Sequence, residues 1–160
     1  MLADCDPTQL YVSVDAADRH TFDRTVKAVE DDAWPKLLDT LDVLAEKEET
    51  RTVIRTTLVE GVNDHTPEWY ATMCRRADVD FLELKAYMHV GHSRGRLDYD
   101  NSPSHERVRA FTEAVADFLP DHDTFREVPE SRVTLLARDS NTMVPELKGG
   151  SDFWAADPST

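Results

Sequence analysis

A lysine stands in this sequence where chemistry can use one, inside an otherwise apolar stretch. Lys85 lies in "DFLELKAYM", two positions after Glu83. A lysine in a buried strand costs free energy unless a partner compensates its charge. Three interpretations are open: an ion pair with Glu83, electrostatic binding of a carboxylate or phosphate, and a Schiff base with a carbonyl substrate. The sequence therefore makes Lys85 a candidate catalytic residue.

Two similar polar pairs occur in other apolar stretches. Ser13 and Asp15 form one pair, and Arg55 and Thr57 form the other. Alternate residues of a strand share a face, so each pair lies on one face of its strand. If these faces meet at the mouth of a barrel, the side chains line one polar pocket. The alternative is that the pairs face solvent or satisfy each other as ion pairs.

A cationic loop follows the strand that carries the lysine. Residues 85–109 contain five bases and three acids, although the whole chain has 18 bases against 32 acids. The glycines in "HVGHSRGRL" allow the backbone to approach a phosphate closely. This local positive charge favours contact with phosphate or a polyanion. In the alternative interpretation, the loop arginines pair with Asp98, Asp100 and Glu106.

Strands and helices alternate along the chain, which predicts an α/β fold. The apolar runs predict strands at 8–16, 52–59, 80–88 and 131–139. Helical periodicity predicts a short helix within 18–34 and longer helices at 34–48, 66–77 and 102–119. This order implies parallel strands with helical crossovers, either in part of a (β/α) barrel or in a doubly wound sheet. Ligands of such folds bind at the carboxyl ends of the strands.

Cysteines and histidines predict no metal site. Cys5 and Cys74 form neither a CxxC nor a zinc pattern, and Cys74 is expected to lie on a helix with its side chain facing the core. His20, His65 and His122 are expected at the surface. No apolar run reaches the ~18 residues of a membrane span, so we expect a cytoplasmic chain with no membrane partner. The net charge of −14 favours a halophilic, haloarchaeal source, and the alternative is an ordinary acidic cytosolic protein.

Three stretches carry a resemblance to a known family. "PTQLYVSVDAAD", "VIRTTLVEGVND" and "DFLELKAYMHVGHSRGRL" resemble the C-terminal half of tRNA 4-demethylwyosine synthases, over about residues 6–138. "KAYMHVGHSR" is the most specific part, and the first two stretches resemble the fourth and fifth strands of radical S-adenosylmethionine enzymes. The resemblance implies the C-terminal part of a partial (β/α) radical-enzyme barrel at 6–88, a wyosine-base-formation region at 89–138 and a partly disordered tail at 139–160.

The resemblance also implies a reaction. The family joins carbons from pyruvate to N1-methylguanosine-37 of tRNA(Phe), which gives 4-demethylwyosine, and it is a carbon–carbon lyase that uses S-adenosylmethionine and a 4Fe-4S cluster. This chain departs from the family because it has no CxxxCxxC motif and hence no cluster ligands. We therefore expect it to be inactive alone, either as a gene fragment or as the complement of a separate N-terminal half.

Roles for particular residues follow from the same resemblance. The cofactor S-adenosylmethionine is expected to contact five residues: Ser13, Asp15, Arg55, Thr57 and Asn63. Lys85 is expected to hold pyruvate or a phosphate of the guanine nucleotide. The tRNA anticodon loop is expected to contact four residues of the cationic loop: His89, Ser93, Arg94 and Arg96. Tyr87 or Tyr99 is expected to stack on a base.

Two other functions compete with this one. The chain could be a non-catalytic tRNA-binding module, because it has the cationic loop without cluster ligands. It could also be an unrelated small α/β protein that binds phosphate. The last interpretation is disfavoured because neither GxGxxG nor GxxxxGK[ST] occurs in the sequence.

Overall fold

The computed structural model describes residues 2–138, which form one mixed sheet and its helices. The elements run in the order β1 (Gln9–Ser13), α1 (Arg19–Thr25), α2 (Ala33–Ala45), β2 (Arg51–Leu58), α3 (Pro67–Ala77), β3 (Phe81–Ala86), α4 (His105–Ala116), β4 (Thr124–Val128) and β5 (Val133–Ala137). Short 3₁₀ turns lie at η1 (Gly91–Gly95), η2 (Tyr99–Asn101) and η3 (Pro129–Ser131). The tail predicted at 139–160 lies outside the described residues.

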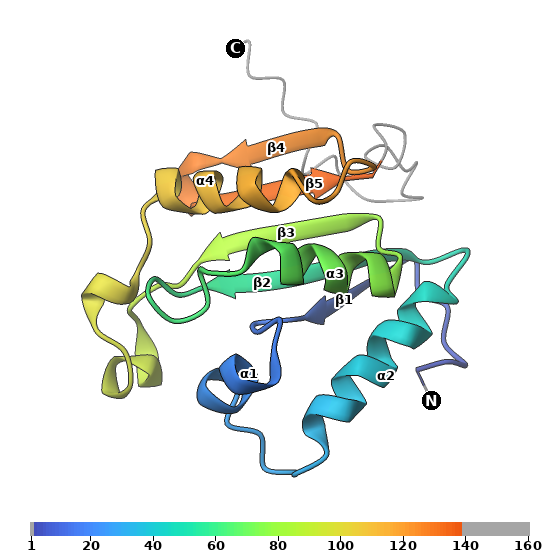
Figure 1. The fold of residues 1–160 in the computed structure, drawn as a ribbon, viewed down its shortest axis with the longest axis horizontal. Helices are drawn as coiled ribbons and strands as arrows, with labels where there is room; N and C mark the ends of the chain where they lie inside the picture. The colour runs from blue at the N-terminus through green and yellow to red at the C-terminus, as the bar shows by residue number, and fades with distance from the viewer. Residues whose placement is uncertain (1, 139–160) are drawn as a thin grey trace.

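The sheet has the strand order β1-β2-β3-β5-β4 (Figure 1). β1, β2 and β3 are parallel, which confirms the α/β class and the predicted direction of these strands. The prediction that the last strand is also parallel is wrong, because β5 runs antiparallel to β3. The reason is β4, which the sequence analysis missed and which forms a hairpin with β5 through η3. β4 reads "TFREV", and its two charged residues hide the apolar pattern of a strand.

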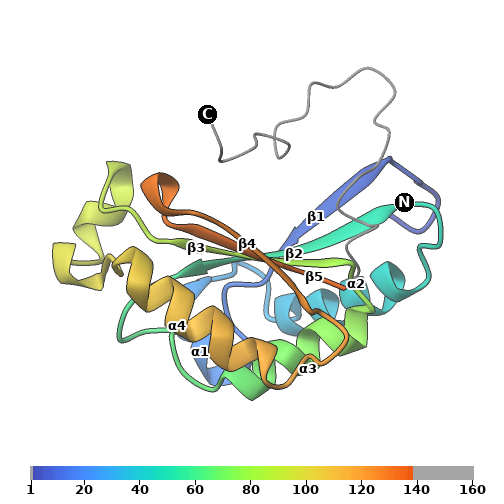
Figure 2. The ribbon, with the colours of Figure 1, turned by 90° about the horizontal axis from the view of Figure 1, so that it is seen from above.

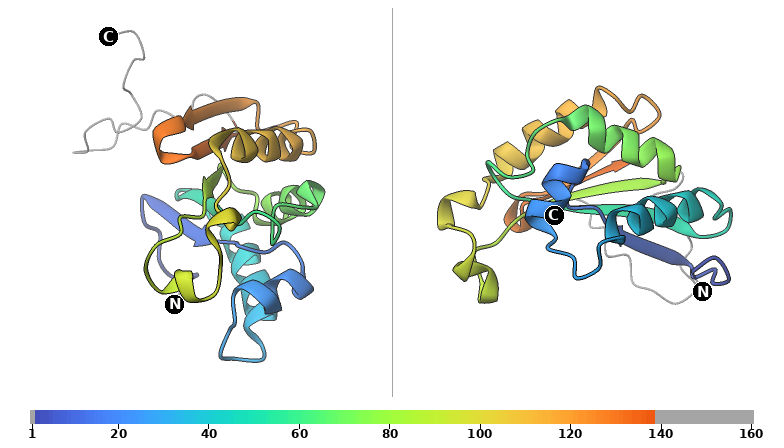
Figure 3. Two further views of the ribbon diagram at one scale, coloured as in Figure 1. Left: turned by 90° about the vertical axis from the view of Figure 1, so that its left-hand side faces the viewer. Right: turned by 60° about the horizontal axis from the view of Figure 1, so that its bottom comes forward.

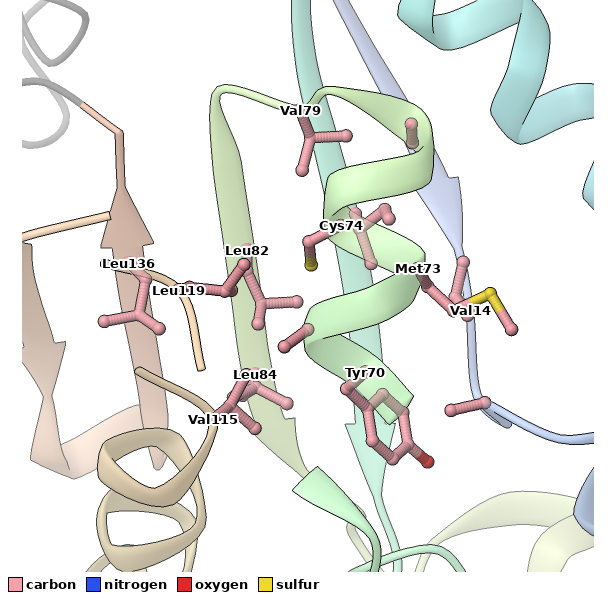
Figure 4. Close-up of a cluster of buried hydrophobic side chains, with 14 of the residues drawn as sticks. Val14, Tyr70, Met73, Cys74, Val79, Leu82, Leu84, Val115, Leu119 and Leu136 are labelled. Atoms are coloured by element: carbon pink, nitrogen blue, oxygen red, sulfur yellow. The ribbon is translucent and has the colours of Figure 1, made fainter. Parts of the chain in front are cut away.

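All four α-helices pack on one face of the sheet (Figure 2). Their apolar sides and the facing side chains of the strands form the main core, part of which is shown in Figure 4. Tyr70 and Cys74 of α3 lie between Leu82 of β3 and Val14, just after β1, and all four are buried. The predicted burial of Cys74 is confirmed, and burial raises the pKa of its thiol to about 12.

The helices begin where the sequence supplies a cap. The carboxylate of Asp18 accepts a hydrogen bond from the backbone N–H of Thr21 at the start of α1 (2.9 Å). The hydroxyl of Ser104 caps α4 in the same way. The predicted helices are confirmed, and Phe118, at the end of the range predicted for the last helix, is 45% exposed. α4 ends before it, and Leu119 takes the buried place instead.

The opposite face of the sheet, the open face, is not covered by any helix of the described chain (Figure 2). Near the amino ends of β2 and β3 this face carries a small apolar cluster of Val53, Phe81, Leu135 and Ala137. Toward the carboxyl ends it becomes polar. The open face is therefore graded along the strands, from an apolar half to a polar half.

An ion pair joins two strands on the polar half of the open face. Arg55 of β2 lies opposite Glu83 of β3, and donates to both its carboxylate oxygens at 2.7 and 3.2 Å. The Glu83 side chain is only 5% exposed, so the charge needs this partner. The alternative pairing of Glu83 with Lys85 is wrong. Residues two apart along a strand are ~6.6 Å apart, whereas facing residues on neighbouring strands are ~4.8 Å apart.

One predicted surface histidine is buried. His20 and His65 are exposed as expected, but His122 is 5% exposed, below the amino end of β3. Its Nε2 lies 3.1 Å from the carbonyl oxygen of Val79, so Nε2 carries the hydrogen and donates it. Its Nδ1 is buried and has no partner within residues 2–138. Burial lowers the pKa of His122, and the charge of Arg138 acts in the same direction.

None of the described helices has the length and hydrophobicity needed to span a membrane.

The buried imidazole predicts a loss of stability in mild acid. Because its folded-state pKa is below the unfolded value of ~6.5, protonation favours the unfolded chain. We expect the free energy of unfolding to lose a contribution of up to ~1.4 kcal/mol per pH unit, beginning as pH falls below ~6.5. His122→Gln, which keeps a donor for Val79, should flatten this part of the profile in urea titrations from pH 7 to 5. His20→Gln is the control, and identical profiles for both variants would contradict the prediction.

The Arg55–Glu83 pair predicts an asymmetric cost of mutation. Arg55→Met leaves a buried carboxylate alone, and we expect it to destabilise the chain by ~2 kcal/mol. This is less than the ~3–5 kcal/mol of a fully buried pair because the Arg55 side chain is 39% exposed. The double variant Arg55→Met/Glu83→Gln should recover at least half of the stability that Arg55→Met loses.

Arg76→Met is the matched control, since Arg76 is also 39% exposed and also binds a carboxylate through two nitrogens, but its partner Asp42 is 53% exposed. We expect it to cost below ~1 kcal/mol in urea unfolding. Equal costs for the two single variants would refute the role of burial.

Candidate functional site

The three predicted polar pairs lie on the open face, in two rows across β1, β2 and β3. The first row is Ser13, Arg55 and Glu83, which face one another in register. The second row lies nearer the carboxyl ends, where Thr57 faces Lys85 and its backbone N–H donates to the carboxylate of Asp15 (2.7 Å). The structure thus brings together side chains that are up to 72 positions apart in the sequence.

The first row is satisfied within itself. Glu83 is fully occupied by Arg55, and the Arg55 guanidinium also stacks over the ring of Tyr11, 4.6 Å from its centroid. Burial raises the pKa of Tyr11, and the charge of Glu83 contributes to that rise. Arg55 is therefore held from two sides. Its charge is compensated on the open face by the carboxylate of Glu83.

The second row holds an unpaired ammonium. Within residues 2–138, Lys85 forms no hydrogen bond and no ion pair, although it is partly buried. Burial raises the pKa of Asp15, while the hydrogen bonds from Thr57 and the charge of Lys85 oppose that rise. Lys85 is thus close enough to influence Asp15 but does not bind it. Its donors remain available to an anion on the open face.

Asn63 lies in the loop after β2, and its side chain is bonded to the backbone. Its side-chain amide donates to the carbonyl oxygens of Asp15 and Thr57 (both 2.9 Å) and accepts from the N–H of Val59 (2.7 Å). Asn63 is 1% exposed, and the hydroxyl of Tyr70 donates to its backbone carbonyl oxygen. Both amide hydrogens are therefore used by the backbone. Asn63 shapes the edge of the sheet rather than offering a free donor to a ligand.

The loop after β3 is held by its own hydrogen bonds. The hydroxyl of Tyr87 donates to Ser93 (3.0 Å) and lies 3.3 Å from Nδ1 of His89, while Ser93 donates to the carbonyl of Val90 (2.6 Å). Arg94 donates to the carbonyl of His89 (3.1 Å). Tyr87 is 7% exposed and cannot stack on a base as proposed from the sequence.

Two side chains of the same loop are free to contact a ligand. Tyr99 is 77% exposed, and its ring packs edge-on to that of His89 at 6.3 Å. Arg96 has no side-chain partner within residues 2–138. Pairing of the loop arginines with Asp98, Asp100 and Glu106 is not found in the described part of the chain. Of the four predicted RNA contacts, Ser93 and Arg94 thus stabilise the loop, while Arg96 is available.

A cavity of about 380 Å³ opens at the carboxyl edge of β1 and β2. We call it the edge cavity, and it is lined by Asp15, Arg24, Thr25, Lys27, Thr57, Val59, Val62, Asn63, Arg96 and Leu97. Its residues come from both strand ends, from α1 and from the loop after β3, which lie at the edge facing the viewer in Figure 3, left. Its volume is within the ~300–1,000 Å³ range of small-molecule sites.

Two loops that border the edge cavity are tied to each other. The N–H of Glu60 donates to the carbonyl of Asn101 (2.9 Å), and the side chain of Asn101 donates back to the carbonyl of Glu60 (3.0 Å). Arg107 of α4 binds the carboxylate of Asp64, whose side chain is 4% exposed. The loop after β2 is thus fastened both to the loop after β3 and to α4.

Sequence reasoning missed Arg24 and Lys27 at this site. They lie at the end of α1 and just after it, in a stretch that has no motif. Their spacing of three residues is the one available signal, because such residues lie on one side of a helical turn. Only the folded chain shows that they share a cavity with Arg96, which is 69 positions further along.

The described residues do not fit a metal cluster. Cys5 is exposed, Cys74 is buried in the core, and no three His, Cys, Asp or Glu side chains of residues 2–138 gather as for a metal ion. We therefore assign no step to an iron–sulfur group held by this part of the chain. Asp15 and Thr57, which the sequence led us to expect at S-adenosylmethionine, lie side by side at the carboxyl ends of β1 and β2.

Comparison with known proteins gives consistent matches. Residues 76–138 match the wyosine base formation family. The S-adenosyl-L-methionine-dependent tRNA 4-demethylwyosine synthase of Pyrococcus horikoshii is 44% identical over 133 residues, which are 83% of this chain and 39% of that protein. The synthase TYW1 of Xenopus laevis is 37% identical over 131 residues, 81% of this chain and 18% of that protein.

Solved structures agree. A structure of TYW1 with a lysine-pyruvate adduct bound has a TM-score of 0.71 and 36% identity, over 83% of this chain and 41% of that one. A crystal structure of archaeal TYW1 has a TM-score of 0.65 and 30% identity, over 86% and 42%. The chain spans about two fifths of these archaeal relatives' length. From sequence and structure together, the chain belongs to the tRNA 4-demethylwyosine synthase family and carries its wyosine base formation domain.

Proposed function

We propose that this chain supplies the substrate-binding C-terminal portion of an S-adenosylmethionine-dependent tRNA 4-demethylwyosine synthase. The reaction would join carbons of pyruvate to N1-methylguanosine-37 of tRNA(Phe), as a carbon–carbon lyase of the radical class. The iron–sulfur chemistry would come from residues other than those described. The single observation that supports the proposal most is the unpaired Lys85 beside Asp15 and Thr57, on a polar face of the sheet.

The two rows suggest a division of labour. Ser13, Asp15 and Thr57 would contact the cofactor S-adenosylmethionine, which supplies the adenosyl group for radical formation when bound. Lys85 would hold the pyruvate carboxylate, because an ammonium without a partner in a partly buried site attracts an anion strongly. Arg55, already bound to Glu83 and stacked over Tyr11, would keep the first row in place beside the cofactor.

The loop after β3 would contact the RNA. His89 and Ser93, which both lie within hydrogen-bonding distance of the Tyr87 hydroxyl, would hold the loop in a fixed shape. Arg94 would support this shape through its hydrogen bond to the backbone carbonyl of His89. Arg96 would reach a phosphate, and the exposed ring of Tyr99 would stack on an unpaired base. The same loop is the reason to keep a second candidate function, a tRNA-binding module without catalysis. The two differ in whether Lys85 matters for anything beyond RNA affinity.

The role of Lys85 is tested by product formation in an intact synthase. Residues 6–138 of this chain would replace the matching segment of the Pyrococcus horikoshii enzyme, which is similar enough to share a core. We expect Lys85→Met to lower the rate of 4-demethylwyosine formation by roughly 10²-fold, as expected when a group that positions the substrate is lost. Lys85→Arg should retain most activity if the side chain acts by charge.

The control is Lys36→Met, because Lys36 pairs at the surface with Glu30 and Asp32. If Lys85→Met and Lys85→Arg lose activity equally, Lys85 acts through a Schiff base, which only the amine can form, and not by electrostatic binding. Full activity of Lys85→Met with undiminished tRNA binding would remove Lys85 from the site and leave the RNA-binding module as the better function.

A further inference from the structure

The basic side chains that lack a partner gather at one place. Residues 2–138 contain every Lys and Arg of the chain except Lys148. Nearly all of them donate to a carboxylate, an amide, a hydroxyl or a carbonyl. Within the described residues, the side chains that form no hydrogen bond or ion pair are four: Arg24, Lys27, Lys85 and Arg96.

Three of these four line the edge cavity. Arg24 comes from α1, Lys27 from the connection after it and Arg96 from the loop after β3, so three separate segments bring positive charge to one hollow. One acid, Asp15, shares the lining, and its carboxylate already accepts the N–H of Thr57. In a chain with 32 acids, this group of cations without carboxylate partners is the exception. Like charges at close range repel unless a bound anion separates them.

Lys27 occupies a position that favours another residue. It follows the C-cap of α1 with a φ of 49°, in the left-handed region where glycine is the usual choice. A lysine here destabilises the fold slightly, so its presence is not explained by local structure. Strained positions of this kind occur at ligand-binding sites, where the side chain has a further role.

We propose that Arg24, Lys27 and Arg96 form a phosphate clamp, which holds the sugar–phosphate backbone of the tRNA substrate in the edge cavity. The clamp rests on the proposed function, because it would give the tRNA substrate a second contact in addition to the loop after β3. A phosphodiester presents two oxygens to a guanidinium, which binds them through parallel N–H donors. The ammonium of Lys27 adds charge without fixed geometry, and Thr25 adds a hydroxyl to the same lining.

The clamp also accounts for how an acidic chain binds a polyanion. The net charge of −14 repels RNA at long range, so attraction must come from a local surface. The edge cavity brings three exposed cations to one hollow, so their attractions for a single phosphate add. The loop cation Arg96 is common to the clamp and to the RNA-binding loop, so the two contacts are continuous.

The test is the affinity of this chain for a tRNA(Phe) transcript, measured by filter binding between 50 and 300 mM KCl. We expect Arg24→Gln and Arg96→Gln each to weaken binding by roughly three- to ten-fold, and to lower the dependence of log K on log salt by about one phosphate contact. Arg19→Gln is the matched control on the same helix, since Arg19 is bound to Asp23, and should stay within about two-fold of the wild-type affinity.

Lys27→Gly separates binding from folding. Glycine relieves the positive φ, so the variant should have a higher Tm than the wild-type chain and yet bind tRNA more weakly. A variant that loses affinity through damage to the fold would show a lower Tm instead. A higher Tm together with wild-type affinity would overturn the role of Lys27.

Other outcomes decide the remaining points. A triple variant of Arg24, Lys27 and Arg96 to Gln that binds tRNA as the wild type does would overturn the clamp, and would leave the proposed function to the assay on Lys85. If inorganic phosphate raises the Tm of the wild-type chain but not that of Arg24→Gln, while both bind tRNA equally, the cavity takes free phosphate and the RNA clamp is wrong. No tRNA binding by the wild-type chain at 50 mM KCl would overturn the clamp even if product formation in the intact synthase depends on Lys85.

Discussion

The carboxyl edge of the sheet depends on the side-chain amide of Asn63. Where β1 and β2 end, their ladder hydrogen bonds end too, and the backbone groups of Asp15, Thr57 and Val59 need other partners because they are shielded from water. Asn63 supplies all of them from one planar group. No other side chain of similar size offers two donors and an acceptor in this arrangement. The positions of Asp15 and of the loop after β2 therefore follow from one residue.

Charged and apolar side chains occupy different parts of the open face along the strands. On the open face, Arg55 and Glu83 compensate each other, so the first row binds no outside charge without losing an internal bond. Lys85, one row further along, has no such partner within the described residues. The apolar cluster around Phe81 closes the far end of the same face. Polar, charged and apolar zones thus succeed one another along the strands, and a ligand is directed to the carboxyl ends.

Much of the architecture could be predicted from periodicity and alternation. The apolar stripe of α2 and the runs of β2 and β3 are long enough for their patterns to be unambiguous, and parallel order follows from the helices between them. β4 could not be predicted in this way. Its exposed edge position tolerates Arg126 and Glu127, so the sequence lacks the apolar signal on which strand prediction depends. Missing one strand also reverses the expected direction of the next.

The site was predictable in part for the same reasons. Alternation placed the polar pairs on a common face, because that rule needs no knowledge of distant segments. The partner of Glu83 was not predictable, since it depends on the register between strands 28 residues apart. The edge cavity was still less predictable from the sequence. Arg24 and Arg96 meet only because the short helix α1 and the loop after β3 turn toward the same edge, and no local pattern records that.

The reciprocal hydrogen bonds between Glu60 and Asn101 have a thermodynamic consequence. They join the loop that contains Asn63 to the loop that contains Arg96, so the two loops share one conformational equilibrium. Ordering of one loop would therefore reduce the conformational entropy that ordering of the other loop costs. By linkage the effect is equal in both directions. A ligand that contacts either loop at the edge cavity would thus stabilise the arrangement of both.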